Sequence, residues 1–389
     1  MKINLPLASD TWDQKELNAA TEILKSKQLT MGLYVKLFEK KINKLIKSKH
    51  CVMCNSGSSA NLLIANVLKF HSKYKLKLGD EIIVPAVSWS TSYAPFYQAG
   101  CKLKFVDIDL QTLNYNLNSL EKAINKKTKV ILVVNLLGNP NNFNKIFKLI
   151  KNTNIILIED NCESLGSKYN NKFCGTIGLM GSFSTFYSHH ISTMEGGFVC
   201  TNNDECYHIL LSLRAHGWTR NLPKKNKIYK FPNKTENENW NFILPGYNLR
   251  PGEIHASIGI QQIKKLNLFI KYRKINAKHF INLFSNSSFY VQKEIGESSW
   301  FGFSLILKEN NIKNIKELKK LLVKLKVDFR PIVTGNFTNQ LAVQYMDYTI
   351  FDNLKNADYA EKFGIMIGNH HYDIRKKLTL LRKEISKIF

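Results

Sequence analysis

The sequence predicts an α/β protein that is built around a central, mainly parallel β-sheet and ends in a smaller α+β region. Three observations predict this class: short β-branched runs recur between residues 50 and 201, helix-period segments lie between them, and a long helical pattern follows. Short apolar runs are typical of strands that are buried on both faces. Their alternation with helices indicates a three-layer α/β domain.

The expected strands share a β-branched, apolar composition and cover residues 81–84, 104–108, 129–134, 155–158, 181–184 and 197–200. The expected helices repeat apolar residues at helical spacing and cover residues 58–74, 117–126, 143–151 and 204–215. Most of the strand runs are too short for a helix and too apolar for an exposed strand, so they predict a buried sheet.

A second region follows the sheet. A helical pattern runs from residue 253 to about 283, and segments 300–307, 315–325 and 327–330 then predict a strand, a helix and a strand. We place the boundary at the start of the long helix, which gives a large domain of residues 1–255 and a small C-terminal domain of residues 256–389. Residues 222–240 are polar and aperiodic, which predicts a long surface loop or a tolerated insertion.

The composition is that of an ordinary globular protein, with 44% hydrophobic and 22% charged residues among 389. No stretch approaches the roughly 18 apolar residues of a membrane span, and the N-terminus lacks the apolar run of a signal peptide. We therefore expect a cytoplasmic protein without a membrane partner. The seven cysteines are an odd number that predicts reduced thiols, and Cys51 and Cys54 are interpreted as core residues rather than a redox or metal pair.

The formal net charge of +26 has two interpretations. A basic surface attracts the phosphates of nucleic acid. The lysines are scattered, however, and no module that combines basic and aromatic residues appears, so solvated lysine-rich faces are favoured over a nucleic-acid surface. An anionic small substrate remains compatible with the charge.

A Gly/Ser motif follows an apolar run and opens a predicted helix. In Asn55-Ser-Gly-Ser-Ser-Ala-Asn61, backbone N–H groups and hydroxyls are expected at the positive end of the helix. That arrangement suits a phosphate, with Gly57 and Ser58 as candidate ligands. An ordinary helix N-cap is an equally good interpretation of this motif alone.

Two further candidates come directly after predicted strands, where ligands bind in open α/β sheets. Asp160 ends a buried strand, and a carboxylate there can hold a pyridinium nitrogen protonated. Trp89, in the run from Pro85 to Thr91, offers a flat face for a ring. In isolation, a solvated or capping acid and a core tryptophan remain open alternatives.

The segment from Gly181 to Gly197, with its Ser-Phe strand, Ser-His-His and Glu-Gly-Gly, completes a pattern. Together with the motifs above, it resembles the DegT-type sugar-nucleotide aminotransferases. The resemblance covers nearly the whole chain, including Thr30-Met-Gly32 and Gly246-Tyr-Asn-Leu-Arg250. It implies the aspartate-aminotransferase-like fold type I of enzymes that depend on pyridoxal phosphate (PLP): a three-layer α/β/α large domain and a small α+β C-terminal domain, with PLP or pyridoxamine 5'-phosphate (PMP) as cofactor.

One position departs from the family. Its cofactor lysine stands six residues before the glutamate, and here that position, counted back from Glu195, holds His189. An imidazole moves a proton but cannot hold the cofactor covalently as a lysine amine does, so ordinary transamination should be lost. The alternative for His189 is a core or capping histidine in an inactive homologue.

Segments 6–9, 135–140, 215–220 and 330–337 are similar to a branch of the family that carries Ser-His-His at the same place. That similarity implies a dehydratase with His189 as its catalytic residue. Such an enzyme removes the carbon-3 hydroxyl of a GDP-linked 4-keto-6-deoxy sugar, mannose or a related heptose, and L-glutamate supplies the amino group that forms PMP. The expected product is a 3,6-dideoxy-4-keto sugar for a surface polysaccharide; the alternatives are a sugar-nucleotide aminotransferase or a catalytically inactive PLP-binding regulator.

The resemblance also assigns the remaining roles. It implies phosphate binding by Gly57, Ser58 and Ser184, ring contacts by Asp160, Trp89 and Glu163, and completion of the partner's site across a two-fold homodimer interface by Asn248 and Arg250. Candidate contacts to substrate or glutamate are His216, Arg220, Arg250 and Arg330, for which simple surface charge is an equally open interpretation. No metal is expected, and no cysteine lies beyond Cys206 to hold the iron–sulfur cluster of another dehydratase in the family.

Overall fold

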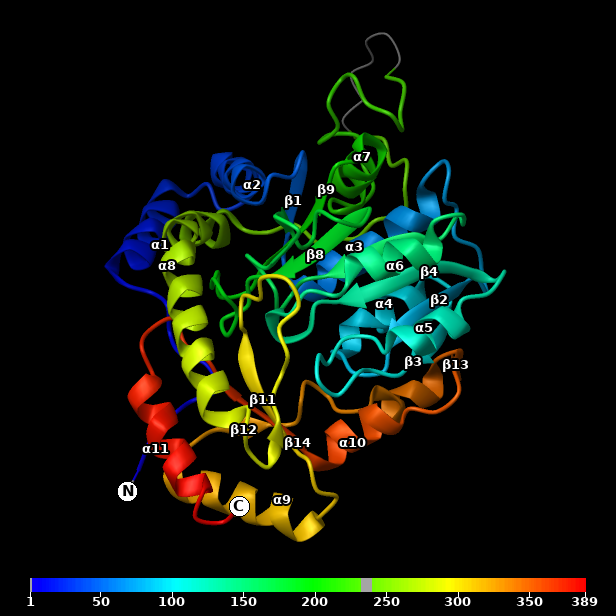
Figure 1. The fold of residues 1–389 in the computed structure, drawn as a ribbon. Coiled ribbons are helices and arrows are strands. Elements are labelled where there is room, and N and C mark those ends of the chain that lie inside the picture. Colours follow the sequence, from blue (N-terminus) through cyan, green and yellow to red (C-terminus); the bar gives the residue numbers. More distant parts are fainter. Residues whose placement is uncertain (1, 232–239) are drawn as a thin grey trace.

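The large sheet has eight strands and lies at the centre of the chain (Figure 1). The structure is a computed structural model that describes residues 2–231 and 240–389. In spatial order, the strands are β1 (His50–Cys54), β9 (Gly197–Thr201), β8 (Met180–Ser184), β5 (Ile156–Asp160), β4 (Thr128–Val134), β2 (Glu81–Pro85), β3 (Lys102–Val106) and β13 (Tyr348–Ile350). β9 runs antiparallel to β1 and β8, and the other neighbours are parallel. The predicted mainly parallel sheet is therefore confirmed, and each of its six predicted strands is found within two residues of its expected ends.

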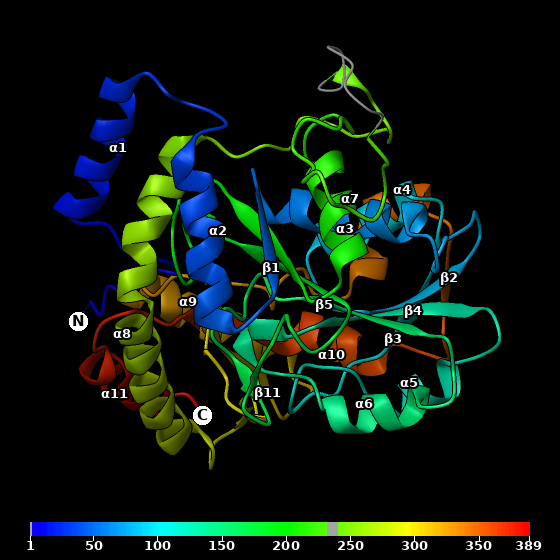
Figure 2. The same cartoon turned by 90° about the horizontal axis from the view of Figure 1, so that it is seen from above.

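Helices cover both faces of this sheet, which makes three layers (Figure 2). One face packs against α3 (Gly57–Phe70), α4 (Ala94–Gln98) and α7 (Asp204–Leu213). The other face packs against α5 (Leu117–Ala123) and α6 (Phe143–Ile150) at one end and against α2 (Leu33–Ile46) and α8 (Glu253–Phe284) at the other. Strand side chains alternate between these clusters, so that Val52 faces α3 whereas Met53 faces α2.

The C-terminal region forms a second, antiparallel sheet against the long helix α8. Its strands, in spatial order, are β10 (Phe289–Tyr290), β11 (Gly302–Leu307), β14 (Gly364–Gly368) and β12 (Phe329–Arg330). The helices of this region are α9 (Ile312–Leu325), α10 (Lys355–Phe363) and α11 (Arg375–Ile385), and α1 (Gln14–Ser26) packs against α8 from the N-terminal side. The predicted α+β character of this region is confirmed.

The two regions exchange segments. Ile3 and Leu5 lie in the hydrophobic core of the second sheet, and β13 extends the first sheet although it comes late in the chain. The boundary expected after residue 255 falls inside the first turn of α8, and the division into domains stays a prediction. Shorter elements are the hairpin β6 (Lys168–Tyr169) with β7 (Lys172–Phe173) and the 3-10 turns Ser90–Ser92, Leu136–Gly138, Phe337–Asn339 and Leu341–Tyr345.

The parallel strands bring the sequence motifs to one edge of the sheet. β2, β4, β5 and β8 point the same way, so their final residues, Pro85, Val134, Asp160 and Ser184, lie at a common edge. The N-terminal end of α3 lies at this edge too, because a Cβ on Gly57 would touch Ser184. This edge is where the fold places a ligand.

The expected loop at 222–240 is described only in part. Residues 222–231 form no helix or strand, as predicted, and residues 232–239 lie outside the described residues. Cys51 and Cys54 are buried free thiols in the core, as expected. In the described part of the chain, no helix has the length and apolar character needed to cross a membrane, and no group of three or more His, Cys, Asp or Glu side chains is arranged to hold a metal ion.

Candidate active site

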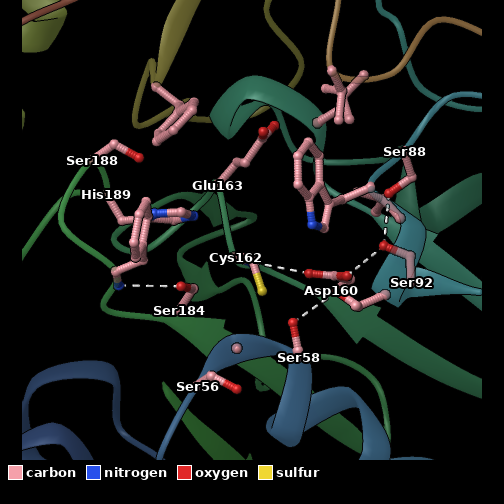
Figure 3. A pocket seen from close by; sticks show the side chains of 18 of the residues that line it. Ser56, Ser58, Ser88, Ser92, Asp160, Cys162, Glu163, Ser184, Ser188 and His189 are labelled. Carbon is pink, nitrogen blue, oxygen red and sulfur yellow. Dashed lines mark hydrogen bonds between the residues drawn. The ribbon is translucent and has the colours of Figure 1, made fainter. Parts of the chain in front are cut away.

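A cavity of about 300 Å³ opens at the carboxyl edge of the large sheet. Figure 3 shows its residues converging from α3, from the strand ends and from the segment after β8. Eight of the predicted site residues line it: Gly57, Ser58, Trp89, Asp160, Glu163, Ser184, His189 and Arg330. The sequence motifs, separated by up to 273 positions (330 − 57), therefore meet in one place.

The N-terminal end of α3 forms one side of the cavity. The Ser56 side chain caps the helix by accepting a hydrogen bond from the Ser59 N–H (3.0 Å). A Cβ on Gly57 would lie 2.6 Å from the Ser184 Cβ and 3.0 Å from the Cys162 Sγ, so only glycine fits between the helix and β8. The result is a cradle of helix N–H groups and serine hydroxyls, which suits a phosphate.

Asp160 is held rigidly at the end of β5. Its Oδ2 accepts hydrogen bonds from Asn61 Nδ2 (2.9 Å) and Ser92 Oγ (2.7 Å), and its Oδ1 accepts one from the Cys162 N–H (3.1 Å). The side chain lines the cavity although it is buried. A carboxyl group fixed in this way at the cavity wall is placed to pair with a cationic ring nitrogen.

Trp89 stands beside the cavity rather than in the core. It precedes the 3-10 turn Ser90–Ser92, and 53% of its surface is exposed. The alternative of a core tryptophan is therefore wrong. Its indole offers a free face along the cavity wall, as expected of a residue that stacks on a ring.

His189 faces the cavity from the segment that follows β8. Its ring lies 5.3 Å from the Phe301 ring and 6.0 Å from the Phe186 ring. Burial, followed by the positive charges of Arg330 and Arg273, lowers the pKa of His189 to about 3. The imidazole is therefore neutral near pH 7, so one ring nitrogen keeps a lone pair that can accept a proton from a bound group.

The two ring nitrogens of His189 differ. Nδ1 is buried and finds no hydrogen-bond partner among the described residues. Nε2 is thus the nitrogen that a group bound in the cavity can reach. His189 lines the cavity whereas His190 beside it does not, which argues against a core or capping role for His189.

Glu163 and Arg330 form the wall near His189. Arg330 Nη2 lies 3.6 Å from Glu163 Oε1, and Glu163 Oε2 accepts a hydrogen bond from the Leu137 N–H (2.9 Å). Burial raises the pKa of Glu163, while Arg330 opposes the rise. The Arg330 side chain lines the cavity and is 33% exposed, so its guanidinium can also donate to a ligand there.

Four predicted residues do not line this cavity: His216, Arg220, Asn248 and Arg250. They gather instead around the Trp218 indole. His216 packs on it edge to face (5.2 Å), and the guanidinium groups of Arg220 and Arg250 lie over it at 5.7 and 5.5 Å. Arg250 Nε also donates to Asn248 Oδ1 (2.9 Å), so the four form one cluster outside the cavity of their own chain.

Several residues of the cavity were missed. Ser92 and Cys162 border Asp160, Glu195 and Ser188 flank His189, and Phe301 closes the side next to its ring. The run from Gly181 to Gly197 already contained Ser188 and Glu195, whereas Ser92 and Cys162 come just after the motifs around Trp89 and Asp160. Phe301 comes from the second sheet, and no local pattern in the sequence links it to the cavity.

The residues present fit PLP. The cradle that a Cβ on Gly57 would fill suits its phosphate, Asp160 suits its ring nitrogen, and Trp89 suits its ring face. A mainly parallel sheet in three layers, a small C-terminal sheet and a site of this kind define the PLP-dependent transferase fold of type I. The predicted fold class is therefore confirmed.

The comparisons with known proteins agree. The model of the DegT/DnrJ/EryC1/StrS aminotransferase family matches residues 10–372, and the chain belongs to this family. It is 53% identical over 384 residues to GDP-4-keto-6-deoxy-D-mannose 3-dehydratase of Escherichia coli O55:H7, covering 98% of this chain and 99% of that one. The enzyme of the same name from Yersinia pseudotuberculosis is 52% identical over 389 residues, covering 99% of both chains.

Solved structures give the same result. The E. coli GDP-4-keto-6-deoxy-D-mannose-3-dehydratase with bound hydrated PLP superposes with a TM-score of 0.95 at 52% identity, covering 99% of this chain and 100% of that one. Helicobacter pylori PseC, an aminotransferase involved in the biosynthesis of pseudoaminic acid, superposes with a TM-score of 0.84 at 24% identity, covering 99% of both chains. The second likeness shows the fold alone, whereas the first extends to the sequence.

Proposed function

We propose that this protein is a PLP/PMP-dependent nucleotide-sugar 3-dehydratase, a lyase. It removes the carbon-3 hydroxyl of a GDP-linked 4-keto-6-deoxy sugar, with L-glutamate as the amino donor that forms PMP. One observation carries the proposal: the described residues that line the cavity include no lysine, and His189 faces the place where the family holds its cofactor lysine. The two relatives above 50% identity that carry the dehydratase name support the same chemistry.

The cofactor would be held without a covalent bond to the chain. Gly57, Ser58 and Ser184 would bind its phosphate, Asp160 its ring nitrogen and Trp89 its ring face. Glu163 would lie near its ring hydroxyl. Because these contacts are all non-covalent, the cradle around Gly57 and the carboxylate of Asp160 must supply most of the affinity.

When bound, PMP supplies an amino group for the sugar ketone and an electron sink for the departure of the carbon-3 hydroxyl. The protein supplies the proton transfer. Neutral His189 would accept a proton from bound PMP at Nε2, and the resulting imidazolium would give a proton to the departing carbon-3 hydroxyl, which would leave as water. Hydrolysis would then release ammonia and a 3,6-dideoxy-4-keto sugar; the two electrons that reduce carbon 3 would come from PMP, which would become PLP and be restored to PMP by glutamate.

Histidine suits this reaction better than lysine. A lysine amine at position 189 would capture the cofactor carbonyl and compete with the external amino donor. The imidazole cannot do so, and the surroundings of His189 keep it neutral. The same group therefore serves as base and acid without a tether.

Substrate binding would use positive charge at two places. Arg330 lines the cavity with a partly exposed guanidinium, which is suited to a carboxylate or phosphate oxygen. The cluster of His216, Arg220, Asn248 and Arg250 lies outside the cavity of its own chain, with aromatic and cationic groups that suit the nucleotide part. The sugar is a 6-deoxy hexose such as the mannose derivative or a related heptose.

We further propose that the cluster around Trp218 completes the site of a partner subunit in a homodimer. Arg250 Nη1 donates to the sulfur of the exposed Met31 (3.0 Å), and the exposed rings of Trp240 and Phe242 pack near the Trp218 ring. An exposed apolar patch of this kind favours association. The homodimer, the domain division into residues 1–255 and 256–389, and the cytoplasmic location, which seven free cysteines suit, are part of this proposal.

A product assay tests the function. The purified protein, supplied with PLP, glutamate and GDP-4-keto-6-deoxymannose, is expected to release ammonia and 2-oxoglutarate and to form the 3-deoxy sugar, detected by mass spectrometry. The corresponding heptose is tested in parallel to fix the sugar. An amino sugar as the product would support an aminotransferase instead, and no product from either sugar would support a regulator.

Subunit complementation tests the shared site. His189→Asn and Arg250→Ala variants are each expected to be nearly inactive. When they are mixed and allowed to exchange subunits, up to about a quarter of the wild-type activity should return, because half of the chains then form heterodimers with one intact site each. A mixture that stays inactive despite proven exchange would contradict the shared site.

A further inference from the structure

A buried arginine lies behind the active site. Arg273, on α8, is 5% exposed, and no carboxylate lies within ion-pair distance of it among the described residues. Burial lowers the pKa of Arg273 to about 10. A buried cation without a counter-charge is costly, so its persistence calls for a functional reason.

Arg273 binds two main-chain segments, one before β11 and one after β14. Its Nη1 donates to the carbonyl oxygens of Phe301 (2.9 Å) and Asn369 (2.8 Å). These residues flank the paired strands β11 and β14 at the end where Gly302 lies opposite Gly368. The guanidinium therefore fixes the end of the second sheet that faces the cavity.

The held segment is strained. Trp300 adopts a positive φ of 52°, which an L side chain rarely accepts, and its carbonyl is bound by Asn369 Nδ2 (2.9 Å) and more distantly by Arg273 (3.5 Å). Strain of this kind persists only where the surroundings enforce it. The bonds from Arg273 and Asn369 enforce the turn that aims Phe301 at the cavity.

Phe301 connects the segment that Arg273 binds to His189 and Glu163. Its ring packs against the His189 ring at 5.3 Å, and its N–H donates to the Leu137 carbonyl (2.9 Å). The Leu137 N–H in turn donates to Glu163 (2.9 Å). A continuous chain of contacts thus runs from Arg273 to two residues of the proposed site.

We propose that Arg273 is a positioning residue for the dehydration, and that from outside the cavity it fixes the Phe301 wall against the imidazole of His189. The inference rests on the proposed function. Arg273 does not line the cavity, so it acts on the reaction only through Phe301 and His189.

A cation serves this place better than a neutral donor. Both bonds leave from Nη1 at the tip of the guanidinium, and a lysine ammonium would fall one bond short of that atom's position. Burial is the main cause that lowers the pKa of His189, and the positive charges of Arg330, on β12, and of Arg273 lower it further. Burial and Arg273 also lower the pKa of the neighbouring His190. Among the described residues, Glu163 pairs with Arg330 (3.6 Å), and Glu195 and Asp160 line the same cavity without forming an ion pair with His189.

Two substitutions test the role. Arg273→Met removes the charge and the bonds, and kcat is expected to fall roughly 10- to 100-fold, as a misplaced reacting group predicts, with KM for the sugar within about threefold. Arg273→Lys keeps the charge, but its shorter side chain does not place a donor where Nη1 meets the Phe301 and Asn369 carbonyls, so kcat should fall roughly 5- to 10-fold. Lys104→Met is the control, because it also removes a buried cation but lies beside Glu81, at the opposite end of β2 from the cavity, and it should lower stability while leaving kcat within about twofold.

The imidazole itself provides a readout that needs no turnover. In cofactor-free protein with 13C-labelled histidine, the His189 signal is assigned by its loss in His189→Asn. Arg273→Met should move this signal, by removing the Phe301 ring contact, and raise its titration midpoint by roughly 0.5 to 1 pH unit. Arg273→Lys should leave the midpoint near that of the wild type.

The proposal is overturned if Arg273→Met keeps the wild-type kcat, or if Lys104→Met reduces kcat equally and the His189 signal is unchanged in both. If Arg273→Met does not fold, a wild-type kcat in Arg273→Lys overturns it. Absence of dehydrated product from the wild type would remove the proposed function instead. The histidine titration would still decide whether Arg273 positions His189.

Discussion

Gly57 offers a direct test of the phosphate cradle. An alanine there would place its Cβ 2.6 Å from the Ser184 Cβ and 3.0 Å from the Cys162 Sγ. Carbon atoms in contact need about 3.5 Å or more, so α3 and β8 must separate by about 1 Å. A hydrogen bond near 2.8 Å stretched by that much is lost.

The magnitude follows from that geometry. Loss of one hydrogen bond to a charged phosphate costs about 1.5–3 kcal/mol, which is a roughly 10- to 150-fold weaker cofactor affinity. Overpacking adds an unfolding cost of about 1–3 kcal/mol. We expect Gly57→Ala to remain folded, with a reduced unfolding free energy and markedly weaker binding of PMP.

Equilibrium dialysis against PMP and urea denaturation measure the two effects. Gly79→Ala is the matched control, because its Cβ would meet nothing within 4 Å but its φ of 81° makes the substitution strained. That control should lose about 1–2 kcal/mol of stability and keep its PMP affinity. An unchanged affinity in Gly57→Ala would refute the assignment of this helix end to the phosphate.

Three further predictions concern charge. Asp160→Asn should reduce kcat by roughly 100-fold in the product assay, because an amide cannot hold the cofactor ring nitrogen protonated; activity near that of the wild type would exclude this role. Lys104→Met should lower the unfolding free energy in urea by about 3 kcal/mol, because it leaves buried Glu81 without its partner at 2.7 Å, and a change below about 0.5 kcal/mol would contradict the reasoning. Since the pKa of His189 is lowered from 6.5 to about 3, the folded protein binds fewer protons than the unfolded chain between these values, so the contribution of His189 to stability is present above pH 6.5 and is lost as the pH falls toward 3. Urea denaturation of His189→Asn across this range should show a shallower decline than the wild type, and identical slopes would argue against a buried neutral imidazole.

The residues at the strand ends could be predicted from the sequence because local pattern and topology act together there. Asp160 and Ser184 end apolar runs, and the parallel arrangement of such runs places their ends at one edge. The substitution at His189 was visible because the surrounding motif fixes its position relative to Glu195. These parts of the site needed no long-range information.

The sequence could not predict contacts between segments that are distant along the chain. Phe301 and Arg273 reach the site through contacts between segments that no periodicity connects.

The strand β13 was also not predicted. It has only three residues, none of them buried, and it joins the large sheet through pairing with β3. The cluster around Trp218 was expected as a set of ligands, but only the structure shows that it lies apart from the cavity of its own chain.

The central claim is that an untethered cofactor works beside an imidazole. Borohydride reduction of the PLP-loaded protein at full turnover, followed by peptide mass spectrometry, tests it most directly. The account predicts that no lysine of the 389 residues carries a stoichiometric phosphopyridoxyl group and that dialysis removes the cofactor. One such group per chain on a single lysine, in an enzyme that still dehydrates its substrate, would contradict it.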